Sequence, residues 1–378
     1  MKDINHCTGC GACAEICHHN AISLTQSDEG FFYPVIDFAK CVHCGLCDQV
    51  CEKCDDFSTQ KPIESYSAFA KSAEQRESGS SGGIFGIMAE KFLAEGGVVF
   101  GAVFSSEEKK VVHTSTEKVS IEKMKRSKYV QSDTKHTFSE AKALLQAGIK
   151  VLYVGTPCEI AGLYAFLEKE YENLLTMDFM CHGVPSPGFF YDALMNYENM
   201  ENSKITDYTF REKNLGWRKQ SVNIYFENEK VIQKESEDFY YYYFLHNYTL
   251  RRSCFGCQYY KNHPADITVA DYWTVPKEKD DDKGISLVFL NSEKGSFIFS
   301  EIQNALVTEP YTELNIERFS HRSYKTKPRE AFFKYYTKNG FERTLRRYVT
   351  KMRLQRLKKR TADAVMSVGI SIKKRIFK

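Results

Sequence analysis

The sequence lacks any uninterrupted apolar run that approaches the length of about 20 residues needed to cross a bilayer. Its first residues, MKDINHCTGC, also lack the apolar core of a secretory signal. Both absences predict a cytoplasmic protein. The number of cysteines is odd, so they cannot all be paired within the chain. Thirteen cysteines in a chain expected in a reducing compartment fit metal or redox sites better than a fully paired disulfide framework.

The chain has 378 residues, of which 42% are apolar and 14% aromatic, enough to bury at least one sizeable core. Its net charge of +3 is unevenly distributed. From Phe341 onward, 13 Lys and Arg face only Glu342 and Asp363, which leaves about −8 on the residues before Phe341. We expect the tail at 311–378 to be helical. Either it packs on its own body, or its cationic side meets a membrane surface or an acidic protein; we expect no nucleic-acid partner.

Residues 1–56 contain an internal repeat of cysteines. The run at 7–17 has the spacing C-x2-C-x2-C-x3-C, and the same spacing recurs 34 residues later at 41–51. Between the two runs, an apolar AISL, a turn-prone SDEG and the segment FFYPVID predict a short hairpin. We therefore expect a small domain in which a hairpin joins two metal-binding loops.

The spacing of each run suits a [4Fe–4S] cubane, because three cysteines of one loop bind one cluster and the fourth crosses to the other. Gly11 and Gly45 follow the second cysteine of each run and ease the tight path of the loop. The alternative for such runs is a zinc site. The predicted ligands are Cys7, Cys10, Cys13 and Cys51 for one cluster, and Cys41, Cys44, Cys47 and Cys17 for the other.

Residues 4–52 resemble the bacterial two-cluster ferredoxin module over their whole length. That family usually has proline after the fourth cysteine of each run, where this sequence has His18 and Glu52. The departure affects the local turn and the reduction potential rather than ligation. Cys54 lies beyond the second run, fits no ligand position and is interpreted as a bystander thiol.

The rest of the chain alternates helix-like and strand-like segments. Apolar strands are expected at 97–104, 149–155 and 174–180, with helices between them. One helix is expected to begin at Thr137, because Thr137 and Glu140 have capping-box spacing. This alternation predicts an α/β body with a partly parallel sheet. The sheet is expected to be mixed, with shorter strands at 222–226, 267–270 and 285–290, while 232–248 has no clear assignment.

Four further cysteines lie outside the repeat and the Cys54 position. Cys158 and Cys181 each follow a predicted strand, at the sheet edge where α/β proteins place their sites. Cys254 and Cys257 form a C-x2-C pair that can clasp one metal. The residues alone leave open a third [4Fe–4S] cluster, a zinc site, or buried thiols beside a redox or zinc pair.

The body resembles the beta subunit family of coenzyme F420 hydrogenases and dehydrogenases. The segments that carry the resemblance are SSGG (80–83), SKYVQS (127–132), VGTPCEIAGL (154–163), CHGVPSP (181–187) and RRSCFGCQYYKNHPADITVADYW (251–273). Members are flavoproteins that hold FAD beside an iron–sulfur cluster, and a preceding ferredoxin module is familiar among them. The resemblance implies FAD, and it favours a third [4Fe–4S] cluster over zinc at the four body cysteines. It divides the body into an N-terminal part at 65–145 and a C-terminal part at 146–310.

Several of these segments suit a flavin site on chemical grounds. The turn at 80–83 precedes a predicted helix, whose N-terminal amides and dipole favour a pyrophosphate, although the same run is also typical of a flexible turn. The segment at 127–132 offers charge and hydrogen bonds, or it is a solvated strand end. His182, beside Cys181, is either a proton donor or a structural histidine. The predicted cofactor contacts are Ser80, Ser81, Gly82, Gly83, Lys128, Tyr129, Gln131, Ser132, Gly155, Thr156 and Asp271, with Asp266 and Trp273 along the same cavity.

The sequence as a whole predicts an iron–sulfur flavoprotein oxidoreductase. Electrons would pass between a hydride carrier such as coenzyme F420 at FAD and a redox partner, a ferredoxin or an oxidoreductase subunit, through the clusters in either direction. The first alternative is a ferredoxin-fed, FAD-dependent reductase of an organic substrate, such as a cell-surface polysaccharide precursor. The second is a non-catalytic relay subunit with clusters and no flavin, and the third is a zinc-stabilised interaction module.

Overall fold

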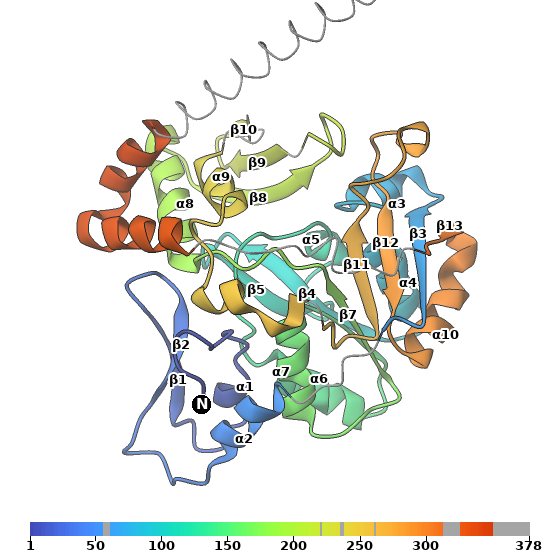
Figure 1. The fold of residues 1–378 in the computed structure, drawn as a ribbon, viewed down its shortest axis with the longest axis horizontal. Helices are drawn as coiled ribbons and strands as arrows, with labels where there is room; N and C mark the ends of the chain where they lie inside the picture. Colours follow the sequence, from blue (N-terminus) through green and yellow to red (C-terminus); the bar gives the residue numbers. More distant parts are fainter. Residues whose placement is uncertain (56–60, 220, 235–237, 261, 313–325, 351–378) are drawn as a thin grey trace, which may run out of the picture.

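The computed structural model describes residues 1–55, 61–219, 221–234, 238–260, 262–312 and 326–350. A small N-terminal module lies beside a larger body that contains the main sheet (Figure 1). Within the described ranges, no helix is both long enough and apolar enough to cross a bilayer.

The N-terminal module contains the predicted hairpin. β1 (Ile22–Gln26) pairs with β2 (Phe32–Ile36) in an antiparallel register, and α1 (Ala12–Glu15) contacts α2 (Leu46–Lys53). At the hairpin turn Gly30 has a φ of 79°, and a Cβ there would lie 2.8 Å from the Cα of Gly188. The turn therefore needs glycine in order to pack against the body.

The body is built on an eight-stranded mixed sheet, which confirms the α/β prediction. Its strands are β3 (Glu64–Ala70), β4 (Val98–Ser105), β5 (Lys110–Ser115), β6 (Val151–Val154), β7 (Leu174–Phe179), β11 (Ile267–Asp271), β12 (Ser286–Leu290) and β13 (Leu306–Pro310). Their order is β13-β3-β12-β11-β7-β6-β4-β5. The central strands β11, β7, β6 and β4 are parallel, and the strands outside them pair antiparallel. Because β3 pairs with β12 and β13, the beginning and the end of the body share one sheet.

Helices cover both faces of this sheet. They are α3 (Ala73–Ser78), α4 (Ile84–Ala94), α5 (Ile121–Met124), α6 (Thr137–Gln146), α7 (Pro157–Leu167), α8 (Pro187–Glu201) and α10 (Glu293–Ile302), with short 3-10 turns at Arg252–Gly256, Gln258–Tyr260, Lys277–Lys279 and Gln303–Ala305. Neighbouring residues of β6 point to opposite faces. Leu152 packs in the core under α4 and α10, whereas Tyr153 packs in the core under α6 and α7. The β6 sequence, VLYV, is apolar throughout because both faces of a central parallel strand are covered.

A second, three-stranded antiparallel sheet carries an aromatic core. Its elements are β8 (Ile205–Glu212), β9 (Ser221–Phe226), β10 (Val231–Lys234) and the covering helix α9 (Phe239–Leu245). The unassigned stretch 232–248 therefore contains the end of β10 and the aromatic helix α9. Residues 327–350 are helical and pack on this core through Phe332, Phe333, Tyr336 and Tyr348 (Figure 1). The helix at 327–350 is the described part of the predicted tail; residues 313–325 and those from 351 onward lie outside the described part, so the tail as a whole stays a prediction.

The predicted capping box at Thr137 and Glu140 is wrong. The N-cap of α6 is His136, and no side chain caps the helix. The Thr137 hydroxyl is buried, where it donates to the carbonyl of Thr134 at 2.7 Å and bonds the Tyr153 hydroxyl at 2.8 Å. The Thr137 hydroxyl therefore bonds buried partners of the core instead of capping the helix.

Candidate iron–sulfur and flavin sites

Each cysteine loop of the module contains a glycine in a left-handed backbone conformation, which allows the loop to turn tightly around a cluster. Gly11 and Gly45 have φ values of 84° and 77°, in the left-handed region that suits the tight loop path expected at these positions, and they form the N-caps of α1 and α2. Backbone amides approach two of the predicted ligands: the N–H of Lys2 lies 3.4 Å from the Sγ of Cys51, and the N–H of Ala21 lies 3.3 Å from the Sγ of Cys17. Such N–H···S contacts fit iron–sulfur ligands, whose potentials depend on them.

The side chains of the first predicted ligand set lie near one another. Burial raises the pKa of the Cys13 thiol, and nearby thiols raise it further; these are Cys10, Cys7, Cys51 and Cys47. Cys51 of the second run lies near the first loop, as the crossing pattern of two-cluster ferredoxins requires, but so does Cys47, which is expected at the other cluster. The assignment of ligands to each cluster therefore stays a prediction.

Cys54 contacts the first loop more closely than the interpretation as a bystander thiol implies. Its side chain is buried, and its Sγ donates to the carbonyl of Val50 at 3.2 Å. A hydrogen bond with Cys10 and burial raise the pKa of the Cys54 thiol, so it stays protonated beside a predicted ligand. Tyr259 of the body donates its hydroxyl to the carbonyl of Cys54 at 2.7 Å.

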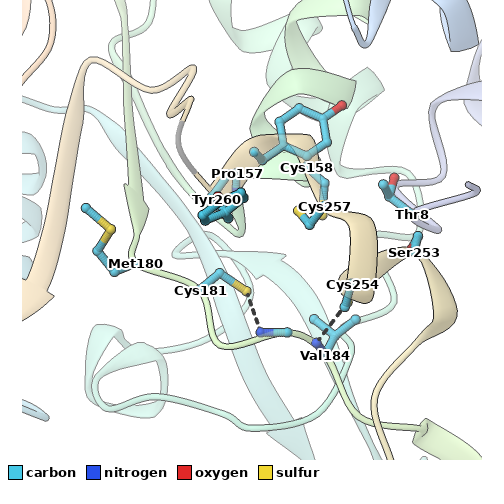
Figure 2. A pocket seen from close by; sticks show the side chains of 12 residues that line it. Thr8, Pro157, Cys158, Met180, Cys181, Val184, Ser253, Cys254, Cys257 and Tyr260 are labelled. Carbon is cyan, nitrogen blue, oxygen red and sulfur yellow. Dashed lines mark hydrogen bonds between the residues drawn. The ribbon is translucent and has the colours of Figure 1, made fainter. Parts of the chain in front are cut away.

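The four body cysteines line one cavity of about 50 Å³ (Figure 2). Cys158 lies in the first turn of α7, and Cys181 follows β7. Cys254 and Cys257 come from the 3-10 turn at 252–256 and the residue after it. The structure therefore brings together four thiols that are up to 99 residues apart in sequence, as the shared-site hypothesis requires.

Polar groups around this cavity point at the sulfur atoms. The N–H of Gly183 lies 3.3 Å from the Sγ of Cys181, and the N–H of Val184 lies 3.5 Å from the Sγ of Cys254. A hydrogen bond of 3.2 Å joins the Thr156 hydroxyl to the Sγ of Cys158. In the described residues no three His, Cys, Asp or Glu side chains are grouped as ligands of a single metal ion. Four thiolates with N–H donors are the donor set of a [4Fe–4S] cluster, which takes one thiolate at each iron.

The body cavity lies next to the first loop of the module. Thr8 lines the cavity together with the four cysteines. Further along α7, Gly162 lies against Cys10, and a Cβ on Gly162 would stand 2.9 Å from the Cβ of Cys10. The absence of a side chain at Gly162 is what lets the first cysteine loop approach the helix that begins with Cys158.

The predicted flavin contacts do not form one site: most of them gather around two buried charged residues, and the others point elsewhere. The first of these residues is Arg211, which sequence reasoning missed. Its guanidinium makes a bidentate pair with Asp271 at 2.8 and 2.9 Å, and donates to the Tyr129 hydroxyl at 3.1 Å and to the carbonyl of Ser80 at 2.8 Å. Burial lowers the pKa of Arg211, but the charges of Tyr129 and Asp271 outweigh it and raise the pKa, so the guanidinium stays charged. Three predicted contacts thus meet at one cation.

Arg211 sits in an unusual backbone position. Its φ is 62°, in the left-handed region, at a register shift of the β8–β9 pair between Phe210 and Glu212. A β-bulge of this kind turns a side chain away from its normal face, and such strained positions are concentrated at functional sites. The Cζ of Arg211 lies 5.1 Å from the ring centroid of Trp273, and that ring stacks on Trp217 with centroids 4.5 Å apart. No pattern of residue types in the sequence predicts this bulge.

The 80–83 turn packs tightly between the sheet and the Arg211 group. Gly83 has a φ of 84° and is the N-cap of α4, so a helix does follow this turn. The amide of Gly82 donates to the hydroxyl of Ser286 at 2.9 Å, and the hydroxyl of Ser81 donates to the carbonyl of Ile285. Lys213 donates to the carbonyl of Ser81 at 2.6 Å, and burial lowers the pKa of Lys213 to about 8.

The second of these residues is Glu159, which is buried in the first turn of α7. The hydroxyl of Ser132 donates to its Oε1 at 2.6 Å, and the amide of Thr156 donates to its Oε2 at 2.7 Å. Thr156 and Glu159 form the reciprocal capping box of α7, and Gly155 leaves room for the carboxylate. These three predicted contacts therefore support the helix that carries Cys158.

Thr156→Ala should lower the stability of the protein by about 0.5–2 kcal/mol, because α7 loses its N-cap. The same change removes the hydroxyl that bonds Cys158, so the absorbance of a body cluster should also change. Urea unfolding followed by far-ultraviolet circular dichroism measures the first effect, and visible spectra measure the second. Ser72→Ala, which removes the N-cap of α3, is the matched control and should alter stability alone. Equal spectra for both variants would contradict a role of Thr156 at the cluster.

The remaining predicted contacts point elsewhere. Gln131 faces the module, where its Nε2 donates to the carbonyl of Thr8 at 3.1 Å. Lys128 directs its ammonium at the carbonyls of Lys123, Lys125 and Arg126. Asp266 is buried, and its carboxylate accepts from Thr176 and Ser292, so it supports the fold rather than a cavity.

His182 lies beside the cysteine cavity without lining it. Its Nε2 bonds the side-chain oxygen of Asn247 at 2.7 Å, and its ring stands edge-on to Phe244 at 5.0 Å. This setting holds the imidazole in a fixed orientation. Its predicted catalytic role stays a prediction.

Comparison with known proteins bears on these sites. Residues 148–313 match the family model for the C terminus of the coenzyme F420 hydrogenase/dehydrogenase beta subunit. This part of the chain is similar to the C-terminal domain of the F420 beta-subunit family. Residues 6–53 match the 4Fe-4S dicluster domain. Both resemblances expected from the sequence are thereby confirmed, and the beta-subunit domain contains all four cysteines of the cavity.

A solved chain from the F420-reducing [NiFe] hydrogenase complex of Methanosarcina barkeri, studied as a xenon derivative, is similar to this protein. The two are 17% identical, the match covers 74% of this chain and 94% of that chain, and the TM-score is 0.47. At that level the likeness carries no argument about function. No curated protein matches the chain. The dicluster and beta-subunit domains together make the protein an iron–sulfur electron-transfer oxidoreductase related to the F420 hydrogenase beta subunit.

Proposed function

We propose that the protein is an iron–sulfur flavoprotein that passes electrons between a hydride carrier of the coenzyme F420 kind and a one-electron partner protein. The observation that supports this most is the cavity in which four cysteines of the beta-subunit domain meet Thr8 of the dicluster module. A third [4Fe–4S] cluster held by these cysteines would lie next to the first loop of the module. When bound, a flavin takes hydride and releases single electrons, which the clusters carry.

The residues of this chain have distinct tasks in the proposal. Cys158, Cys181, Cys254 and Cys257 would hold the third cluster. The 80–83 turn at the start of α4 would receive the pyrophosphate of FAD, and Lys213 beside it supplies positive charge. The group around Arg211, with the Trp217 and Trp273 rings, is the best-built polar and aromatic setting near that turn. It is therefore the proposed wall of the flavin site.

Anaerobic purification with iron, sulfide and flavin quantified per chain tests this proposal. We expect about twelve irons, from three four-iron clusters, and one FAD. Coenzyme F420 should then be reduced or oxidised in exchange with a one-electron dye. Turnover with reduced ferredoxin but not with coenzyme F420 would instead favour a reductase of an organic substrate. About eight irons and no flavin would contradict the proposal and favour a relay subunit.

A further inference from the structure

Arg251 is a fully buried arginine at the junction between the dicluster module and the body. Its Nε donates to the carbonyl of Cys7 at 2.8 Å, and its Nη2 lies 3.6 Å from the Sγ of the same residue. The Nη2 also donates to the carbonyl of Phe32 at 2.9 Å, and the Nη1 donates to the Oε1 of Gln131 at 2.8 Å. The guanidinium therefore reaches the sulfur of a predicted ligand and the two segments beside it.

The surroundings of this guanidinium contain rings rather than acids. Its Cζ lies 4.2 Å from the ring centroid of Tyr33 and 5.4 Å from that of Phe31. Among the described residues no carboxylate pairs with Arg251. A buried cation is costly unless an anion or several good acceptors compensate it. The thiolate of Cys7, which is negative when it holds iron, is the anion within reach.

Charge near a ligand sulfur acts on the two redox states of a cluster unequally. When a [4Fe–4S] cluster takes up one electron, its negative charge grows by one. A cation bonded to a ligand sulfur stabilises the reduced state more than the oxidised state, and the attraction is strong because the site is shielded from water. Hydrogen bonds to sulfur and the burial of the cluster are established determinants of its potential. Arg251 supplies such a contact to the Cys7 sulfur, together with a positive charge.

Arg251 is also part of the body cavity's framework. Its N–H donates to the carbonyl of Val184 at 2.9 Å, and the N–H of Cys254 donates to the carbonyl of Arg251 at 3.1 Å. The backbone of Arg251 thus supports the loop with Cys254, while its side chain contacts Cys7. One residue joins the sulfur environments of two sites.

We propose that Arg251 is a positioning residue that raises the reduction potential of the cluster bound by Cys7. This rests on the dicluster part of the proposed function and on neither the flavin nor the third cluster. The first cluster would then hold an electron more readily than it would without this guanidinium.

An anaerobic redox titration followed by electron paramagnetic resonance tests the proposal on the full chain. In Arg251→Gln, the ratio of reduced to oxidised first cluster at a fixed poise should fall about tenfold, which corresponds to a midpoint lower by about 59 mV. The second module cluster should keep its midpoint. Arg251→Lys retains the positive charge but loses the planar guanidinium with its several N–H donors. The midpoint of the first cluster should therefore lie between those of the parent protein and Arg251→Gln.

Arg329→Gln is the matched control. Arg329 is equally buried, donates to the carbonyl of Leu250 at 2.6 Å and pairs with the carboxylate of Glu29 at the same hairpin, with its Cζ 4.5 Å from the Phe333 ring. It contacts no cysteine in any described bond. Its replacement should loosen the junction without moving either midpoint.

Several outcomes would overturn the proposal. Unchanged midpoints in Arg251→Gln, equal shifts of both clusters, or the same shift in Arg329→Gln would each show a role in general packing only. Loss of iron in both Arg251→Gln and Arg251→Lys would show a role in cluster assembly instead of tuning. Failure of the proposed hydride chemistry is distinguishable, because it would leave the titration of the module clusters intact.

Discussion

Replacement of Cys181 and Cys254 together by alanine should lower the iron content of the anaerobically purified protein from about twelve to about eight per chain. Both sulfurs line the body cavity, and each lies near a backbone N–H, of Gly183 and Val184 respectively. A cubane that loses two of its four thiolates has no protein ligand for two irons. Acid-labile sulfide should fall in parallel, while the absorbance of the module clusters persists.

Cys54→Ala is the control for this experiment. Cys54 is buried and lies near Cys10, yet it fits no ligand position, so its variant should keep all the iron of the parent protein. Retention of about twelve irons by the double variant would show that Cys181 and Cys254 are not ligands of a third cluster. A fall well below eight would show instead that the module clusters depend on the integrity of the cavity.

Asp271→Ala should lower the free energy of unfolding by about 3–5 kcal/mol, because it leaves the charge of Arg211 buried and without its carboxylate. The side chain of Arg211 is only 3% exposed, and both of its terminal nitrogens bond Asp271. The remaining partners are the hydroxyl of Tyr129 and the carbonyl of Ser80, and neither is a carboxylate. Urea unfolding followed by circular dichroism would measure the loss.

The double variant Arg211→Met with Asp271→Ala separates the charge from the packing. Once the cation is removed too, most of the lost stability should return, since replacing a whole buried pair costs far less than breaking it. Lys118→Ala breaks the exposed pair with Glu140 and should cost at most about 1 kcal/mol. If the double variant were less stable than Asp271→Ala, the contacts of Arg211 with Ser80 and Tyr129 would be the dominant contribution.

The dicluster module could be predicted from the sequence, because the cysteines of each run are close in sequence and their spacing suits a cubane. Which cysteines bind which cluster stays a prediction. The central strands were predictable as well, since strands covered on both faces are continuously apolar. The four body cysteines needed the resemblance to be grouped, because nothing in their spacing indicates that α7, the end of β7 and the 252–256 turn meet at one cavity.

The flavin contacts were the least predictable part. Gln131 and Ser132 are neighbours in one motif, yet their side chains point in opposite directions, one to the module and one to Glu159. Lys128 was expected to meet a cofactor, but its ammonium is directed at three carbonyls of its own loop. Arg211, which gathers three of the predicted contacts, depends on a β-bulge that no pattern of residue types specifies.

The glycine on α7 has a consequence for rates. Cys158 and Gly162 are four residues apart, about 6 Å along the helix axis, and Gly162 is where Cys10 touches the helix. Electron tunnelling slows steeply with distance. If Cys158 holds a cluster, the distance from that cluster to the first cysteine loop is therefore fixed by one turn of α7. Because α7 fixes this distance, electron exchange does not require the module and the body to meet by diffusion. Its rate should therefore be insensitive to solvent viscosity.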